Sequence, residues 1–397
     1  MPAELDFNKL RALREGLAAL RAKHLVSLEA YLSHDGKGFA HQIVDLEEAS
    51  MASSATCVVS LIRAGLWKGE VRNSTAAIAA KLVSARTSAG LPNWNPFSLS
   101  FMAEGVLALA GECADYAGKE KNLKLIQIKF AERLIKHLIN EDGLNTKGAI
   151  AIDPYPSSAY LTQLVQRTLV QLGAIGQAPT VDMHRWARSE INKQIALIGA
   201  GSRTADPLQL AYALILATDT LVDERTSPED KEIFSHALNV FFEEQLDDGT
   251  WPLSRPMFHY RKVGNAYCFD FELLVQLLSC KPLRDELLRH LPELEKALTL
   301  ATRTSYELEP DAPGQKLAWA SGHHPQLPGP ESWSTASVYH FAHAFDRLIA
   351  EGVRRALFQE IGVSYPGPPT GPNAEARSGK LVFASKFLDA DLRPVEI

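Results

Sequence analysis

A helical pattern that stops and restarts at near-equal intervals constrains the fold of this 397-residue sequence more than any other feature. Leucines spaced three to five positions apart mark residues 6–32 as a helix with one apolar stripe. The pattern breaks at Asp35-Gly36, and Asp-Gly pairs return at Asp142 and Asp248. Such self-similarity is typical of stacked units that bury one another's apolar faces. The sequence therefore predicts a helical repeat.

The helical segments pair into six hairpins, and few segments alternate with period two, so we expect an all-α protein with little sheet. Two helix starts are well marked, because Asp206 and Ser227 each precede a proline at the first helical position. The predicted pairs are 6–32 with 50–66, 74–87 with 96–116, 123–139 with 157–172, 182–198 with 206–221, 227–245 with 265–280, and 283–302 with 332–350.

One of these joints has a distinctive sequence, in which Gln245 ends a helix, Gly249 follows in a turn, and Trp251 comes directly after it. A glycine permits positive φ at a helix end, a Gln side chain can bond helix-end carbonyls, and a Trp can cover the turn. The joint resembles the QW motif of terpenoid cyclases and related α/α toroids, in which a Gln and a Trp close the outer helix of each hairpin.

The resemblance implies a closed ring, since six hairpins also close the toroids of terpenoid cyclases, protein prenyltransferases and several glycosidase families. An open α-solenoid of the same hairpins is the alternative. In the closed form, six inner helices would surround one mouth of a central cavity with their N-termini. These helices would begin near Ser50, Pro96, Ser157, Asp206, Asn265 and Ser332.

Composition narrows the function classes. A hydrophobic fraction of 46% with 22% charged residues is ordinary for a globular protein, and the net charge of −6 gives no basic footprint for general nucleic-acid or anionic-membrane binding. We expect no membrane span and no secretory signal. The four cysteines form no CxxC pair, so buried free thiols and a reducing cytoplasm are expected.

The character of the chain changes near its end. Residues 1–362 form the expected helical domain, and residues 363–397 begin with a Pro/Gly-rich linker, Tyr365–Pro372, that cannot continue a helix. The tail resembles the segment that leads into an ATPase domain in multidomain bacterial proteins. No GxxxxGK[ST] loop occurs in these residues, so this resemblance implies only a possible neighbouring domain.

Candidate ligand contacts are the polar and aromatic residues expected at the mouth of the ring. The aromatic residues among them have two interpretations, either as loop packing or as a stacking wall for a sugar, a base or an isoprenoid. The candidates are Trp94, Asn95, Ser158, Tyr160, Tyr267 and Trp333. A cationic loop, residues 255–262, is either solvated or a site for an anionic ligand or an acidic partner.

Asp270 is the candidate catalytic acid, although a buried acid bonded to a neighbouring loop is the alternative. Glu272 is two positions away and therefore faces another side of the helix, so the two acids do not form a pair. Resemblance to prenyltransferase β subunits raises the possibility of zinc, which that family binds through an Asp, a later Cys and a distant His. Here Cys268 precedes Asp270, and we predict neither a metal nor a cofactor.

The acid motifs DxDD and DDxxD of terpenoid cyclases are missing from the sequence. We therefore expect a non-catalytic binding or regulatory domain for an unidentified small molecule or protein partner. The alternative is an enzyme that acts on an isoprenoid or a glycan in the central cavity.

Overall fold

The structure is a computed structural model. It describes residues 7–84, 96–112, 158–173, 180–221, 227–253, 255–256, 258–260, 264–309, 311, 314–322 and 329–360. Most of these residues are helical, and the strands among them form two short antiparallel pairs. The pairs are β1 (Phe258–Tyr260) with β2 (Gly264–Ala266), and β3 (Tyr306–Glu307) with β4 (Leu317–Ala318). The all-α prediction is confirmed for this part, whereas the predicted helix 123–139 and the tail 363–397 lie outside the described residues.

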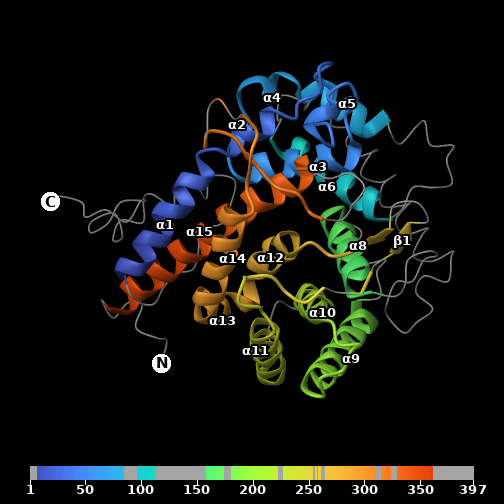
Figure 1. Ribbon diagram of the computed structural model, residues 1–397. Coiled ribbons are helices and arrows are strands. Elements are labelled where there is room, and N and C mark those ends of the chain that lie inside the picture. The colour runs from blue at the N-terminus through green and yellow to red at the C-terminus, as the bar shows by residue number, and fades with distance from the viewer. Residues whose placement is uncertain are drawn as a thin grey trace.

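Six helices, which we call the circuit helices, pack against one another in chain order (Figure 1). Each contacts the next, and α15 contacts α3, so the contacts return to their starting point. The circuit helices are α3 (Met51–Arg63), α6 (Pro96–Glu112), α8 (Ala159–Gln171), α10 (Pro207–Asp219), α12 (Asp270–Ser279) and α15 (Ser332–Glu360).

The longer of the remaining described helices lie against the circuit. Figure 1 shows α1 (Phe7–Arg21) running alongside α15, which it contacts. The helices α5 (Thr75–Ser84), α9 (Thr180–Gly199), α11 (Pro228–Glu243) and α14 (Leu291–Arg303) pack on α6, α10, α10 and α15 respectively. Shorter helical segments are α2 (His24–Glu29), η1 (Ile43–Asp45), α4 (Gly69–Asn73), η5 (Lys281–Leu283), α13 (Arg284–Leu287) and η6 (Leu288–His290).

Hydrogen bonds join the first hairpin to the last. Gln42 and Glu331 form an isolated antiparallel bridge. The Ser332 hydroxyl donates to the Ala40 carbonyl at 2.6 Å, and the hydroxyl of Ser60 in α3 donates to a main-chain carbonyl of α15 at 2.9 Å. All three serine and alanine residues named here are buried. Since buried polar groups are costly unless they are paired, these bonds fix how α3 meets α15.

The helix starts follow the predicted capping chemistry. The Asp206 carboxylate accepts the main-chain N–H groups of Leu208 and Gln209, both at 3.1 Å, and caps α10. The Ser227 hydroxyl accepts the N–H of Asp230 at 3.0 Å and caps α11. A side-chain acceptor at this position pairs a donor that the first helical turn leaves unsatisfied.

The joint between α11 and α12 matches its prediction at Gly249 and Trp251, whereas Gln245 bonds carbonyls of the turn and of α14 instead of those at the end of its own helix. The Gln245 amide donates to the carbonyls of Gly249 and Glu293, both at 3.1 Å, so it ties the turn to helix α14. The Trp251 indole donates to the Phe241 carbonyl at 2.9 Å and stacks on the Phe241 ring. Gly249 has φ +89°, and a Cβ there would lie 2.7 Å from the carbonyl oxygen of Lys296. Only glycine fits this close approach.

Three predicted helices differ from the structure, and one of them is the segment 283–302, which is divided among η5, α13, η6 and α14. The segment 265–280 becomes helical only at Asp270, because residues 264–266 pair as β2 with β1. Segment 6–32 forms two helices, α1 and α2, rather than one.

The described cysteines are free, with Cys57 and Cys280 buried and Cys268 half-buried. Cys113 lies outside the described residues. No described helix combines the length and the apolar character that crossing a membrane requires.

Candidate ligand-binding site

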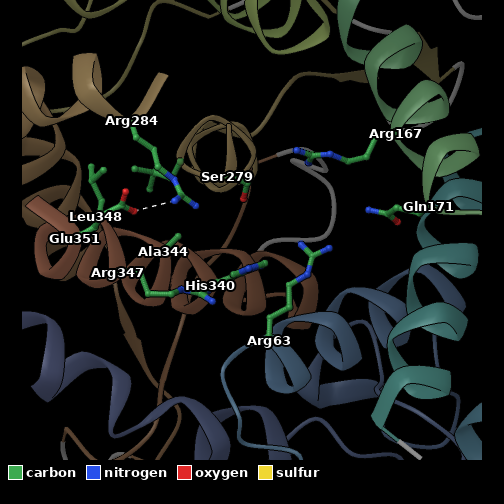
Figure 2. A pocket seen from close by; sticks show the side chains of 11 residues that line it. Arg63, Arg167, Gln171, Ser279, Arg284, His340, Ala344, Arg347, Leu348 and Glu351 are labelled. Carbon is green, nitrogen blue, oxygen red and sulfur yellow. Dashed lines mark hydrogen bonds and ion pairs between the residues drawn. The ribbon is translucent and has the colours of Figure 1, made fainter. Parts of the chain in front are cut away.

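A cavity of about 340 Å³, which we call the outer cavity, opens where α3, α8 and α12 end. Its volume falls at the lower end of the roughly 300–1,000 Å³ typical of small-molecule pockets. Figure 2 shows Arg63, Arg167 and Arg284 pointing into this space from different helices. The lining residues are Arg63, Arg167, Gln171, Leu278, Ser279, Arg284, His340, Ala344, Arg347, Leu348 and Glu351.

Three guanidinium groups of this cavity have an acidic neighbour that uses few of their donors. Arg63 Nη2 donates to Glu104 at 2.5 Å, and Arg284 Nη1 donates to Glu351 at 2.8 Å. Arg167 Nε lies 3.7 Å from Asp219, beyond hydrogen-bonding distance. A guanidinium carries five N–H donors, so a single ion pair leaves most of them available.

Arg167 stays charged although its side chain is only 19% exposed. Burial lowers the pKa of its guanidinium, but the carboxylate of Asp219 and further neighbours outweigh this effect, and the pKa is raised overall. Helix C-termini attract cations, which accounts for Arg63 at the last position of α3. That attraction does not account for Arg347, in the middle of α15, or for Arg284, the first residue of α13. The cluster therefore exceeds what helix ends require.

His340 lies in the wall between these arginines and is 8% exposed. Burial lowers the pKa of its imidazole well below the usual value, and the positive charges of Arg63 and Arg347 lower it further. The imidazole is therefore neutral near pH 7 and adds a polar but uncharged group to the cavity.

A smaller cavity of about 60 Å³, the inner cavity, adjoins the outer one, because Arg63, Arg167 and His340 line both. Glu272 and Gln276 of α12 also line it, together with apolar side chains from α3, α6 and α8. The inner cavity is thus enclosed by circuit helices and combines apolar walls with buried polar groups.

Glu272 is hydrogen-bonded by Tyr160, which the sequence analysis proposed as a ligand contact. The Tyr160 hydroxyl donates to Glu272 Oε1 at 2.5 Å, and the Tyr160 ring packs against Phe97 and Tyr212. Burial raises the pKa of the Glu272 carboxyl to about 7, the hydrogen bond from Tyr160 opposes the rise, and the negative charge of Glu104 adds to it. Glu272 therefore changes protonation state near neutral pH.

The structure places Asp270 at a helix start, where its Oδ2 accepts the main-chain N–H of Trp251 at 3.4 Å. Burial raises the pKa of this carboxyl to about 7. Two other hairpins make the same kind of contact, because Ser54 accepts from the N–H of Phe39 at 2.8 Å, and a threonine near the start of α15 accepts from a loop N–H at 3.0 Å. Asp270 thus makes a contact with a loop N–H that neutral hydroxyl residues make in two other hairpins.

The predicted ligand contacts that the structure describes do not line either cavity, although Tyr160 bonds Glu272 of the inner cavity. Ser158 accepts the N–H of Leu161 at 3.1 Å and caps α8. Trp333 is half-buried in the first turn of α15, and its ring contacts Phe269 edge to face. Tyr267 is half-buried in the loop before α12. Trp94 and Asn95 lie outside the described residues. Asp270, Ser158, Tyr160, Tyr267 and Trp333 are not among the residues that line either cavity.

Sequence reasoning missed the arginines because each stands alone in its own helix. Arg167 carried the clearest signal, since it interrupts the apolar residues of a helix expected to line the ring. A charged residue in a largely buried helix needs a partner or a polar cavity. Only the packing of α3, α8, α13 and α15 brings the group together.

No group of three or more His, Cys, Asp or Glu residues in the described part of the chain is arranged to hold a metal ion. Comparison of the chain with protein-family models, with curated proteins and with solved structures finds no match.

Proposed function

We propose that the protein is an α/α-toroid ligand-binding domain that takes a small anionic molecule into its central cavity. The circuit of helix contacts and the bonds between the first and last hairpins support the toroid. In such a ring the outer and inner cavities are two parts of one central space. The domain acts as a regulatory or carrier module, and its ligand is the signal or the cargo.

One observation carries this proposal, namely the convergence of four arginines on one cavity whose lining includes a single carboxylate, Glu351. Arg63, Arg167 and Arg284 each have one carboxylate nearby, yet most of their donors remain available, and Arg347 donates from Nε to the main-chain carbonyl of His343 at 3.3 Å. Arginine recognises oxyanions through several directed hydrogen bonds, and such charge-assisted bonds are stronger than neutral ones. A bound anion would therefore satisfy donors that the chain itself leaves unused.

Calorimetric titration with inorganic phosphate and sulfate at constant ionic strength tests the proposal. We expect binding that weakens about tenfold or more in Arg167→Gln and in Arg284→Gln, because each removes a charge-assisted contact. Arg185→Gln is the matched control, since Arg185 is 76% exposed on α9 and is not among the residues that line the cavity. Equal affinities in all four proteins would refute an anion site in this cavity.

The raised pKa of Glu272 favours a second candidate function, which is catalysis. A carboxyl with a pKa near 7 in a cavity is suited to general acid catalysis. In the alternative of a terpenoid cyclase-like or glycan-acting enzyme, we propose Glu272 rather than Asp270 as the acid. Turnover of a bound ligand by the wild type, lost in Glu272→Gln and kept in Asp270→Asn, would favour the enzyme over the binding domain.

A further inference from the structure

The arginines of the outer cavity approach from several directions. Arg63 comes from α3, Arg167 from α8 and Arg284 from α13, and Figure 2 shows their side chains converging from different sides. A carboxylate offers two oxygens in one plane, whereas a phosphate group offers three oxygens in three directions and carries up to two negative charges. Donors arranged on several sides of a cavity therefore match a phosphate group better than a carboxylate.

The inner cavity shares two arginines with the outer cavity, and its other polar groups include hydrogen-bond acceptors. Gln276 is 7% exposed, lines this cavity, and its Oε1 has no hydrogen-bond partner in the described part of the chain. Glu272 lies one turn earlier on the same helix, and Tyr160 bonds only its Oε1. A buried acceptor without a partner costs free energy. The chain thus presents acceptors that a ligand hydroxyl would satisfy.

The two cavities adjoin, so one ligand can reach both. We propose that the ligand is a small phosphate monoester with a hydroxyl-bearing body. Its phosphate lies among the arginines of the outer cavity, and a hydroxyl donates to Gln276 or Glu272 in the inner cavity. This inference rests on the anion-binding function proposed above, and it adds the chemistry of the neutral part.

The volumes limit the ligand. The inner cavity of about 60 Å³ has room for a group of only a few non-hydrogen atoms. An apolar chain in that space would leave the acceptors of Glu272 and Gln276 without donors, at a desolvation cost. A hydroxylated body of about three carbons is small enough for the inner cavity and supplies donors to its acceptors. A long apolar tail does neither.

Three probes of graded chemistry separate these possibilities by calorimetry on the wild-type protein. They are inorganic phosphate, propyl phosphate and glycerol 3-phosphate, of which the last two share a three-carbon body and differ in the hydroxyl groups. We expect glycerol 3-phosphate to bind about tenfold more tightly than propyl phosphate, because only its hydroxyls satisfy the buried acceptors.

A substitution then assigns the preference to the inner cavity. In Gln276→Leu the preference for glycerol 3-phosphate over propyl phosphate should disappear, while the affinity for inorganic phosphate stays unchanged. Gln315→Leu is the matched control, since Gln315 is exposed and lies outside both cavities. Far-UV circular dichroism and thermal unfolding verify that the variants fold. If Gln276→Leu does not fold, the comparison of the three probes on the wild-type protein still decides the question.

The outcomes distinguish the two proposals. If no probe binds, or if binding is indifferent to Arg167→Gln, the anion-binding function itself is wrong. If phosphate binds through the arginines but the wild type holds propyl phosphate as tightly as glycerol 3-phosphate, the function stands and the hydroxylated ligand is overturned. A preference that persists undiminished in Gln276→Leu and in Glu272→Gln also overturns it.

Discussion

The two ends of the circuit helices use polar side chains in opposite ways. Where the helices begin, Ser54, Ser158 and Asp270 each accept a main-chain N–H within their own loop or helix. Where α3, α8 and α12 end, Arg63 and Arg167 present donors to a cavity, and their acidic neighbours occupy few of them. The first end satisfies its polar groups internally, and the second does not.

This difference explains why the described residues that were predicted to bind a ligand lie at or near the starts of the circuit helices, where polar side chains satisfy main-chain groups of the fold. A loop that enters a helix leaves main-chain donors without partners, and small polar side chains satisfy them. The same residue types therefore serve as caps and as ligand contacts, and their types alone do not distinguish the two roles. A buried arginine is less ambiguous, because the fold needs few of its donors.

The largest expected effect tests the structural end. Trp251→Ala should lower the free energy of unfolding by about 3–5 kcal/mol, because it empties a buried site and removes the indole bond to Phe241. Urea titration measures the change, and Leu253→Ala, at a residue that is 84% exposed, is the control with almost no effect. A loss below about 1 kcal/mol in Trp251→Ala would mean that the joint does not hold the hairpin.

Two acids sharpen the comparison, because Asp270 and Glu272 both have a pKa raised to about 7 and both lie in the first turn of α12, yet of the two only Glu272 lines a cavity. An acid whose pKa is higher in the folded state binds protons preferentially in that state, so its stabilising contribution is lost as pH rises from about 4 to 7. We expect Glu272→Gln and Asp270→Asn each to gain on the order of 2 kcal/mol relative to the wild type between pH 4 and pH 8, measured by urea unfolding.

Phosphate affinity at pH 8 then separates the two acids. Only Glu272 lines a cavity, so Glu272→Gln should change the affinity and Asp270→Asn should leave it unaltered. An affinity that changes in Asp270→Asn but not in Glu272→Gln would show that Asp270, and not Glu272, belongs to the binding site.

A smaller effect is expected at the start of α8. Ser158→Ala removes the acceptor for the Leu161 N–H and should cost about 1 kcal/mol in the free energy of unfolding. Phosphate affinity should not change, since Ser158 lies outside the cavity lining. Thermal unfolding and calorimetry measure both quantities, and Ser158→Asp should restore the stability. A loss of affinity without a loss of stability would contradict the capping role.

The smallest predicted effect concerns His340 at the other end. Its pKa is lowered by burial and by the charges of Arg63 and Arg347, so the imidazole should stay neutral in the free protein at pH 6. An anion beside these arginines should raise the imidazole pKa by a fraction of a unit. Sulfate is the suitable probe, because its own charge is constant at this pH, and nitrogen-15 NMR of the ring reads the change. An unaltered pKa under saturating sulfate would place the anion elsewhere.

The sequence by itself determined the local features of the fold. Helical periodicity, the caps at Asp206 and Ser227, and the turn of Gly249 and Trp251 all follow from neighbours along the chain, and the structure has each of them. Where a contact from outside the segment intervenes, prediction failed. The pairing of β2 with β1 takes residues 264–266 out of the expected helix.

Only the tertiary structure decided which polar residues share a cavity. Arg63, Arg167, Arg284 and Arg347 are separated by long stretches of sequence and have no common motif, yet helix packing places them around one space. The position of Asp270 also depended on packing, because its partner is a loop N–H rather than a ligand. Local sequence fixes backbone hydrogen bonding within a few residues, whereas the electrostatics of a cavity arise from side chains that meet only after the helices have packed.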